Sequence, residues 1–393
     1  MTTPLQRSRG MRDLLPGDMR AFRRVEDAFR AAASRWGYEE VRTPTIETYS
    51  LFTATGALTP KMLARVYSFL DWDGWSGERV VLRPDSTIPV SRAATQAGVP
   101  LPARLFYVQN VFRFAAEDGR EEWQCGLEYL SAPPTLGDLE VAAVACETLD
   151  ALGISPVVRI GHAGISHAVA KAAGPAAMAI VDGDGDTSLT HLRPAVTDPQ
   201  LAALLELTAG REGDLAYLAN VRALATMGLP SAQPALDEVE SLATALQESG
   251  RRVVIDFDQP LDFAYYTGAV FELSSEGAVW GRGGRYSPGG ESTPATACGL
   301  GLEISALSQF VSPGTRRRLS VAVVPETAAE MGRAMTVARA LHRSGIAAAL
   351  ADTSGGHRLT VKVGPGTLVA RTPDGERTME ALDDVVGLLV QYK

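Results

Sequence analysis

The sequence predicts an α+β fold, and three features of the chain support this prediction. Segments with apolar residues at helical spacing alternate with short β-rich runs over the first part of the sequence. Residues 166–250 are alanine- and leucine-rich with helical periodicity, which favours a helical insertion. Residues 319–393 follow a strand, helix and strand pattern, as in a small α/β domain. We therefore expect a mixed core over residues 1–315, interrupted by the insertion and followed by the small domain.

Individual elements can be assigned along the core. The helical pattern of residues 19–36 ends at Gly37, a residue type that commonly stops helices, and a strand-like run broken by Pro44 follows. A second amphipathic helix is expected over residues 137–152. Strands are expected where β-branched and aromatic residues cluster between turn residues, at 80–82, 105–108, 253–257 and 269–273.

The composition narrows the class of protein. The chain has 393 residues, 46% hydrophobic and 21% charged, as in globular proteins of two or three domains. Its net charge of −9 gives no support for nucleic-acid binding. No apolar run approaches the ~20 residues of a membrane span, and the N-terminus lacks an apolar signal core, so we expect a cytoplasmic protein. The three cysteines lack metal-ligand spacing, so we expect buried, reduced thiols, no metal and no cofactor.

Four segments carry polar or aromatic side chains suited to a ligand site. They are Leu82-Arg83-Pro84-Asp85-Ser86-Thr87, the run from Val111 through Arg113 and Arg120 to Gln124 and Glu128, Ala264-Tyr265-Tyr266-Thr267-Gly268, and Gly299-Leu300-Gly301-Leu302-Glu303-Ile304. Asp85 and Thr87 can accept hydrogen bonds from an ammonium group. Gln124 and Glu128 lie four residues apart on an alternating strand, so their side chains share one face of a sheet.

Each of these segments also has a purely structural interpretation. Asp85 and Ser86 follow a strand, and either residue suits the N-cap of a helix. A partly buried ion pair between Arg113 and Glu128 would hold a sheet together. Tyr265 and Tyr266 would form a buried aromatic pair in the core. No single segment decides between these interpretations and a ligand site.

Together the four segments resemble the histidine-binding site of histidyl-tRNA synthetase, a class II aminoacyl-tRNA synthetase. The helix and strand of residues 19–47 resemble motif 1, through which that family dimerises. The resemblance spans roughly residues 8–310 and implies an antiparallel sheet flanked by helices. Residues 319–393 are similar to a reduced anticodon-binding domain, but they lack the basic character of a tRNA-binding surface.

The resemblance also implies roles for individual side chains. The residues expected to bind histidine are Asp85, Thr87, Arg113, Gln124, Glu128, Tyr265 and Tyr266. Asp85 and Thr87 would receive the ammonium group, and Arg113 would receive the carboxylate. Glu128 would accept an N–H of the imidazole ring. Arg113 and Arg120 are in addition candidates for phosphate binding.

Two departures from the synthetase pattern bear on catalysis. Leu261 stands where the family has an arginine that acts on the histidine carboxylate, and Ile304 stands where it has an arginine that holds the γ-phosphate of ATP. Adenylation needs fixed cations at developing negative charge, and one such contact typically contributes roughly 3–4 kcal/mol. Ala115 replaces the glutamate of motif 2 as well. We therefore expect a protein that binds histidine without activating it.

This combination resembles the regulatory subunits of ATP phosphoribosyltransferase, paralogues of histidyl-tRNA synthetase used in the first step of histidine biosynthesis. The resemblance implies a non-catalytic homodimer that associates with the short catalytic subunit and confers feedback inhibition by histidine, without binding tRNA. Two alternatives stay open. One is an active histidyl-tRNA synthetase with divergent motifs, which histidine-dependent pyrophosphate exchange would identify. The other is a synthetase-like ligase or a binder of another partner.

Overall fold

The computed structural model describes most of the chain in two compact units, Met1–Gly314 and Thr315–Lys393. The described residues are 7–54, 58, 60–72, 77–115, 119–184, 188–259, 265–288, 296–313, 320–353 and 358–392. Leu261 and Ala264, which belong to the tyrosine segment, lie outside these ranges.

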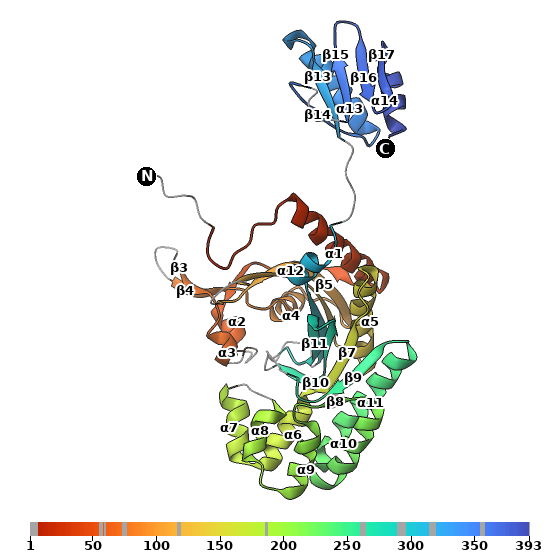
Figure 1. The fold of residues 1–393 in the computed structure, drawn as a ribbon. Helices are drawn as coiled ribbons and strands as arrows, with labels where there is room; N and C mark the ends of the chain where they lie inside the picture. Colours follow the sequence, from red (N-terminus) through yellow and green to blue (C-terminus); the bar gives the residue numbers. More distant parts are fainter. Residues whose placement is uncertain are drawn as a thin grey trace. The chain divides into compact units, whose positions relative to one another are not determined.

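A largely antiparallel sheet forms the centre of the first unit (Figure 1). In spatial order its described strands are β1 (Glu39–Glu40), β5 (Ala103–Phe112), β6 (Glu121–Leu130), β12 (Ala297–Glu303), β11 (Ala278–Tyr286), β10 (Tyr266–Ser275), β7 (Val157–His162), β9 (Arg252–Asp256) and β8 (Glu212–Gly213). Neighbouring strands run antiparallel except in the β1–β5 and β7–β9 pairs. The predicted α+β class, with an antiparallel sheet, is confirmed.

Helices bury one face of this sheet. They include α1 (Pro16–Arg35), α5 (Leu136–Ala151) and α12 (Ile304–Phe310), and α11 (Gln233–Glu248) packs beside α5 on the same core. In α1 the apolar residues Phe22, Val25 and Phe29 recur every three or four positions, and all three are buried. They pack with Leu127 and other alternate residues of β6, which explains why the helix predicted over residues 19–36 forms here.

The opposite face of the same strands carries a smaller apolar cluster and the candidate site. Helix α4 (Thr87–Gln96) packs there through Ile88 and Val90, against Tyr107 of β5 and Leu130 of β6. Because side chains alternate along a strand, β5 and β6 contribute to both clusters.

A small three-stranded sheet precedes α4 in the chain. Its order is β2 (Ile46–Thr48), β4 (Gly77–Leu82) and β3 (Ser68–Trp72), and the short helices α2 (Tyr49–Ala54) and α3 (Pro60–Leu63) accompany it. Directly after β4, the buried guanidinium of Arg83 donates hydrogen bonds to the carbonyl oxygens of Thr43, Pro44 and Asn110. These bonds fix the turn from which Asp85 and Thr87 extend.

The central part of the chain forms helices that gather at one end of the unit (Figure 1). They are α6 (Ala163–Ala173), α7 (Pro175–Asp184), α8 (Leu189–Leu192), η1 (Arg193–Ala195), α9 (Pro199–Thr208), α10 (Leu215–Gly228), η2 (Pro230–Ala232) and α11 (Gln233–Glu248). The segment is not purely helical, because β8 pairs with β9 at the edge of the large sheet.

The second unit contains its own sheet and hydrophobic core. The sheet order is β14 (Ala347–Leu350), β13 (Ser320–Pro325), β15 (Leu359–Val363), β16 (Leu368–Thr372) and β17 (Gly375–Met379). The helical elements are η3 (Ala328–Glu330), α13 (Met331–Arg343) and α14 (Leu382–Val390). Residues such as Val337 of α13 and Val385 of α14 are buried against the sheet.

Three further observations concern expectations from composition. Cys125, Cys146 and Cys298 are buried and form no disulfide. Within the described ranges, no cluster of three or more metal-ligating side chains occurs. No helix in the described part of the chain has the length and hydropathy needed to cross a bilayer.

Candidate functional site

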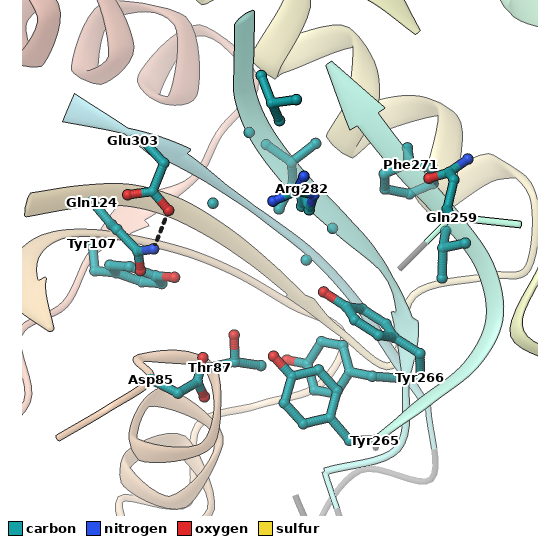
Figure 2. A pocket seen from close by; sticks show the side chains of 18 of the residues that line it. Asp85, Thr87, Tyr107, Gln124, Gln259, Tyr265, Tyr266, Phe271, Arg282 and Glu303 are labelled. Carbon is teal, nitrogen blue, oxygen red and sulfur yellow. Dashed lines mark hydrogen bonds between the residues drawn. The ribbon is translucent and has the colours of Figure 1, made fainter. Parts of the chain in front are cut away.

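A pocket with a cavity volume of about 160 Å³ lies where β6, β12, β11 and β10 run side by side (Figure 2). Its polar lining consists of Asp85, Thr87, Arg113, Gln124, Gln259, Arg282 and Glu303, and four tyrosines line it as well, Tyr107, Tyr265, Tyr266 and Tyr286. The structure therefore brings together six of the seven predicted histidine-binding residues in one lining. The seventh, Glu128, lies behind it.

Asp85 and Thr87 occupy one end of the pocket, at the start of α4. Ser86 is the N-cap residue of α4 and its side chain makes no capping hydrogen bond. Asp85, one residue earlier, accepts a hydrogen bond of 3.1 Å at Oδ2 from the backbone N–H of Ile88 in the first turn, and its side chain also lines the pocket. Burial raises the pKa of Asp85, whereas the Ile88 N–H and the charge of Arg113 lower it. A carboxyl group in this position can receive a cationic ligand group.

Tyrosine rings form the wall beside this acidic end (Figure 2). The ring centroids of Tyr265 and Tyr266 lie 4.9 Å apart, and those of Tyr265 and Tyr286 lie 5.4 Å apart. Tyr265 is buried and Tyr266 is partly buried, so the two rings form the expected aromatic pair, although only one of them lies fully in the core. Because all three rings line the pocket, their packing positions hydroxyl groups for a polar, planar ligand group.

Glu128 lies in β6 behind this wall, with an exposed fraction of only 1%. Its Oε2 accepts a hydrogen bond of 2.6 Å from the Tyr286 hydroxyl, and the Thr87 hydroxyl also bonds to it. The carboxyl group occupies the space over Gly299 of β12, where a Cβ atom would come within 2.3 Å of Oε2. Burial raises the pKa of Glu128 to about 8, although these two hydrogen bonds oppose the rise. In this structure Glu128 contacts lining residues rather than the cavity itself.

Gln124 and Glu303 form the other polar end of the pocket (Figure 2). Gln124 Nε2 donates a hydrogen bond of 2.5 Å to Glu303 Oε1 across the β6–β12 pair. Arg113 lies near both acidic ends, because its charge acts on Asp85 and on Glu303. Its Nε donates a hydrogen bond of 2.8 Å to the carbonyl oxygen of Pro84. Burial raises the pKa of Glu303, and the charge of Arg113 lowers it.

The remaining predicted residues and departures are placed as follows. Arg120 is outside the pocket lining, because its Nε donates to the Ala115 carbonyl oxygen at 2.7 Å and its guanidinium lies over the Phe114 ring. Ile304 is fully buried in the core beneath α1 rather than in the pocket. Arg282 supplies a second guanidinium to the lining, and Glu272 binds it at 2.9 Å.

Some lining residues were not predicted as site residues from the sequence. They are Tyr107, Gln259, Arg282, Tyr286 and Glu303. Arg282 and Tyr286 are four residues apart on one glycine-rich strand, and this even spacing was a usable signal for a shared sheet face. Tyr107 had a subtler signal, because Gly126 opposite it leaves room for its ring: a Cβ there would meet the ring at 2.3 Å.

Comparison with known proteins agrees with this fold. The family model of histidyl-tRNA synthetase matches residues 10–307. The chain therefore belongs to the histidyl-tRNA synthetase family, with its class II synthetase-like fold.

Within this family, the similarity to ATP phosphoribosyltransferase regulatory subunits is confirmed. The regulatory subunit of Dehalococcoides mccartyi is 41% identical, with 76% of each chain covered. The histidine–tRNA ligase of Archaeoglobus fulgidus is 31% identical, covering 81% of this chain and 79% of its own. A crystal structure described as an ATP phosphoribosyltransferase regulatory subunit/histidyl-tRNA synthetase from Bacillus halodurans is 25% identical with a TM-score of 0.74, covering 90% of this chain and 94% of that one.

Proposed function

We propose that this chain is the regulatory, non-catalytic subunit of an ATP phosphoribosyltransferase and that its pocket binds histidine as a feedback inhibitor. The observation that carries the proposal is the composition of the pocket. The buried acid Asp85, the partly buried acid Glu303, the tyrosine hydroxyls and the Arg113 guanidinium suit a zwitterionic amino acid with a polar ring. The names of relatives that are 41% identical support the regulatory role.

In this proposal the ligand is bound through three groups. Its ammonium group lies against Asp85 and Thr87, since a carboxyl and a hydroxyl there are its natural acceptors. Arg113 receives the carboxylate. The imidazole ring lies against Tyr265 and Tyr266, and Gln124 contributes a polar contact.

Glu128 has a different role from the one expected from the sequence. It lies behind Tyr286 and Thr87 and bonds to both hydroxyls, so it positions them rather than touching the ring. A buried carboxyl group that accepts a hydrogen bond from a tyrosine hydroxyl fixes the position of the ring. It also orients the lone pairs of the hydroxyl oxygen. We therefore assign Glu128 as a positioning residue.

The absence of adenylation is part of the same proposal. Ile304 is buried in the core, so no cation extends from that position into the pocket. Of the two guanidiniums in the described lining, Arg282 is already bound by Glu272. Adenylation requires preorganised cations at the phosphates, and their loss costs a factor of roughly 10²–10³ each.

The partners follow from family membership and remain proposals. The catalytic partner is the short form of ATP phosphoribosyltransferase, in the cytoplasm. The chain dimerises through the motif 1 region around α1, and it does not bind tRNA. Histidine acts by binding one arrangement of the complex more tightly than another, because a ligand shifts an equilibrium only by its differential affinity.

Reconstitution tests this function. Purified chain is mixed with a short catalytic subunit, and phosphoribosyltransferase activity is measured against histidine concentration. Asp85→Asn removes the acceptor charge for the ammonium group, so the half-inhibitory histidine concentration rises by roughly tenfold or more. Glu121→Gln, on β6 but outside the pocket lining, serves as the matched control and keeps wild-type inhibition. If the Asp85→Asn chain activated the catalytic subunit and histidine inhibited this complex as strongly as the wild-type one, the pocket would not be the site of histidine binding.

A second candidate function is histidyl-tRNA synthetase activity. The observation in its favour is the 31% identity with the Archaeoglobus fulgidus ligase. Histidine-dependent exchange of pyrophosphate into ATP distinguishes the two functions, because only a synthetase forms the adenylate.

A further inference from the structure

Three buried or nearly buried carboxyl groups surround the pocket: Asp85, Glu128 and Glu303. Asp85 is 4% exposed and Glu128 is 1% exposed. The charge of Arg113 acts on Asp85 and on Glu303 and lowers the pKa of each. Among the described residues, no cation contributes to the pKa of Glu128.

The described groups that face Glu128 lie on, or just before, α4, β5, β10, β11 and β12, and none of these groups is basic. Tyr286 of β11 and Thr87 of α4 donate hydrogen bonds to its carboxyl group. The other titratable groups acting on it or responding to it are Asp85 before α4, Tyr107 of β5, Tyr265 before β10 and Cys298 of β12. Of these groups, Asp85 is the one whose charge raises the pKa of Glu128, because like charges disfavour each other. Burial raises the pKa of Tyr107, Tyr265 and Cys298, so they stay neutral and supply no charge that would favour ionised Glu128.

This environment determines the charge of the free pocket. Burial, together with a smaller contribution from the charge of Asp85, raises the pKa of Glu128 to about 8. The carboxyl of Glu128 is therefore mostly protonated at neutral pH when the pocket is empty. An ammonium group against Asp85 and Thr87 would bring a positive charge next to it, because the Thr87 hydroxyl bonds directly to Glu128.

We propose that an ammonium-bearing amino acid enters this pocket in exchange for the proton that Glu128 holds, so that ligand binding is coupled to proton release. The inference rests on the proposed function and adds a pH dependence to it. The O–H bond of the Glu128 carboxyl breaks and its proton passes to solvent water. The ligand keeps its own ammonium proton, and no covalent bond to the protein forms.

The direction of the pH effect follows from this exchange. At pH values below the pKa of Glu128 in the empty pocket, the ligand must displace the proton of Glu128. The affinity for the ligand therefore increases as the pH rises. Between about pH 6.5 and 7.5 the affinity rises roughly fivefold to tenfold. Above about pH 8 the carboxyl is already ionised, and the affinity levels off.

Calorimetric titration with histidine, using the full chain, tests the proposal. Titrations at pH 7.5 in phosphate and in Tris give different apparent enthalpies if protons are released, because the two buffers have different ionisation enthalpies. Wild-type protein is expected to release about three-quarters of a proton per histidine. Glu128→Gln keeps the shape of the side chain and an acceptor for Tyr286, and it is expected to release almost none. Glu121→Gln, the same chemical change on the same strand, keeps the wild-type release.

Each outcome is decisive. Histidine binding with equal enthalpies in the two buffers overturns the proton exchange and leaves the proposed function standing. Equal proton release from wild type and Glu128→Gln, both shown to be folded by circular dichroism, also overturns it, because the proton then comes from another group. No histidine binding by the wild-type chain overturns the proposed function, and with it the exchange.

Discussion

Asp85 and Glu128 differ in what their surroundings allow, although both are buried carboxyl groups of one site. Asp85 has a backbone N–H and the charge of Arg113 to favour its ionised form. Glu128 has hydroxyl donors, and Asp85 as a neighbouring acid. The sequence placed both residues in the site through their motifs, but strand spacing alone did not show that Glu128 lies behind Tyr286. That position depends on the β6–β12 register and on Gly299 opposite it.

The buried carboxyl of Glu128 also makes stability depend on pH. Its folded-state pKa of about 8 lies above the ordinary value, so its contribution to stability is fully present below about pH 4 and is lost as the pH rises to about 8. Between about pH 5.5 and 8, the free energy of unfolding of the wild type is expected to fall by about 3 kcal/mol relative to Glu128→Gln, which does not titrate.

Urea unfolding at the two pH values, without ligand, measures this difference. Glu121→Gln, the same chemical change elsewhere on β6, is again the control. A constant difference for Glu128→Gln would mean that Glu128 is ionised in the folded protein.

At the scale of elements, periodicity located most helices and strands of the core. The helix predicted over residues 19–36 is α1, the strand predicted at 105–108 lies within β5, and that at 269–273 lies within β10. The pocket lining was harder to predict, because it depends on which strands are neighbours. Glu303 and Gln124 are 179 residues apart in sequence and share a hydrogen bond only because β12 pairs with β6.

Arg285 of β11 connects this strand to α5, and its loss should lower the free energy of unfolding. Its guanidinium binds Asp138, at the start of α5, at 2.6 Å, and donates to the carbonyl oxygens of Ala132 and Pro133. Removing one partner of a buried pair leaves the other charge uncompensated, so Arg285→Ala is expected to cost roughly 3–5 kcal/mol. Thermal and urea unfolding measure this loss.

The matched control is Arg251→Ala, which breaks the partly exposed ion pair with Asp150. Such pairs contribute about 0–1 kcal/mol, so this variant should unfold close to the wild type. A loss of similar size in both variants would show that burial of the Arg285 pair carries no special weight.

For the whole molecule, family membership and the chemistry of the pocket both support a synthetase-like protein that binds an amino acid. The chain keeps the synthetase-like fold over its first unit, with a separate small sheet unit after it. The sequence motifs predicted this class because four segments occur in the right order. They could not predict the cavity, whose acids and hydroxyls meet only when strands distant in sequence pair.

The most direct test of the central claim is a calorimetric titration of the full chain with histidine, made in parallel with an assay of histidine-dependent pyrophosphate exchange. We expect saturable histidine binding that Asp85→Asn weakens, with no pyrophosphate exchange above background. Pyrophosphate exchange that depends on histidine would show that the chain activates histidine, as the aminoacylating members of its family do. Absence of histidine binding would contradict the assignment of the pocket.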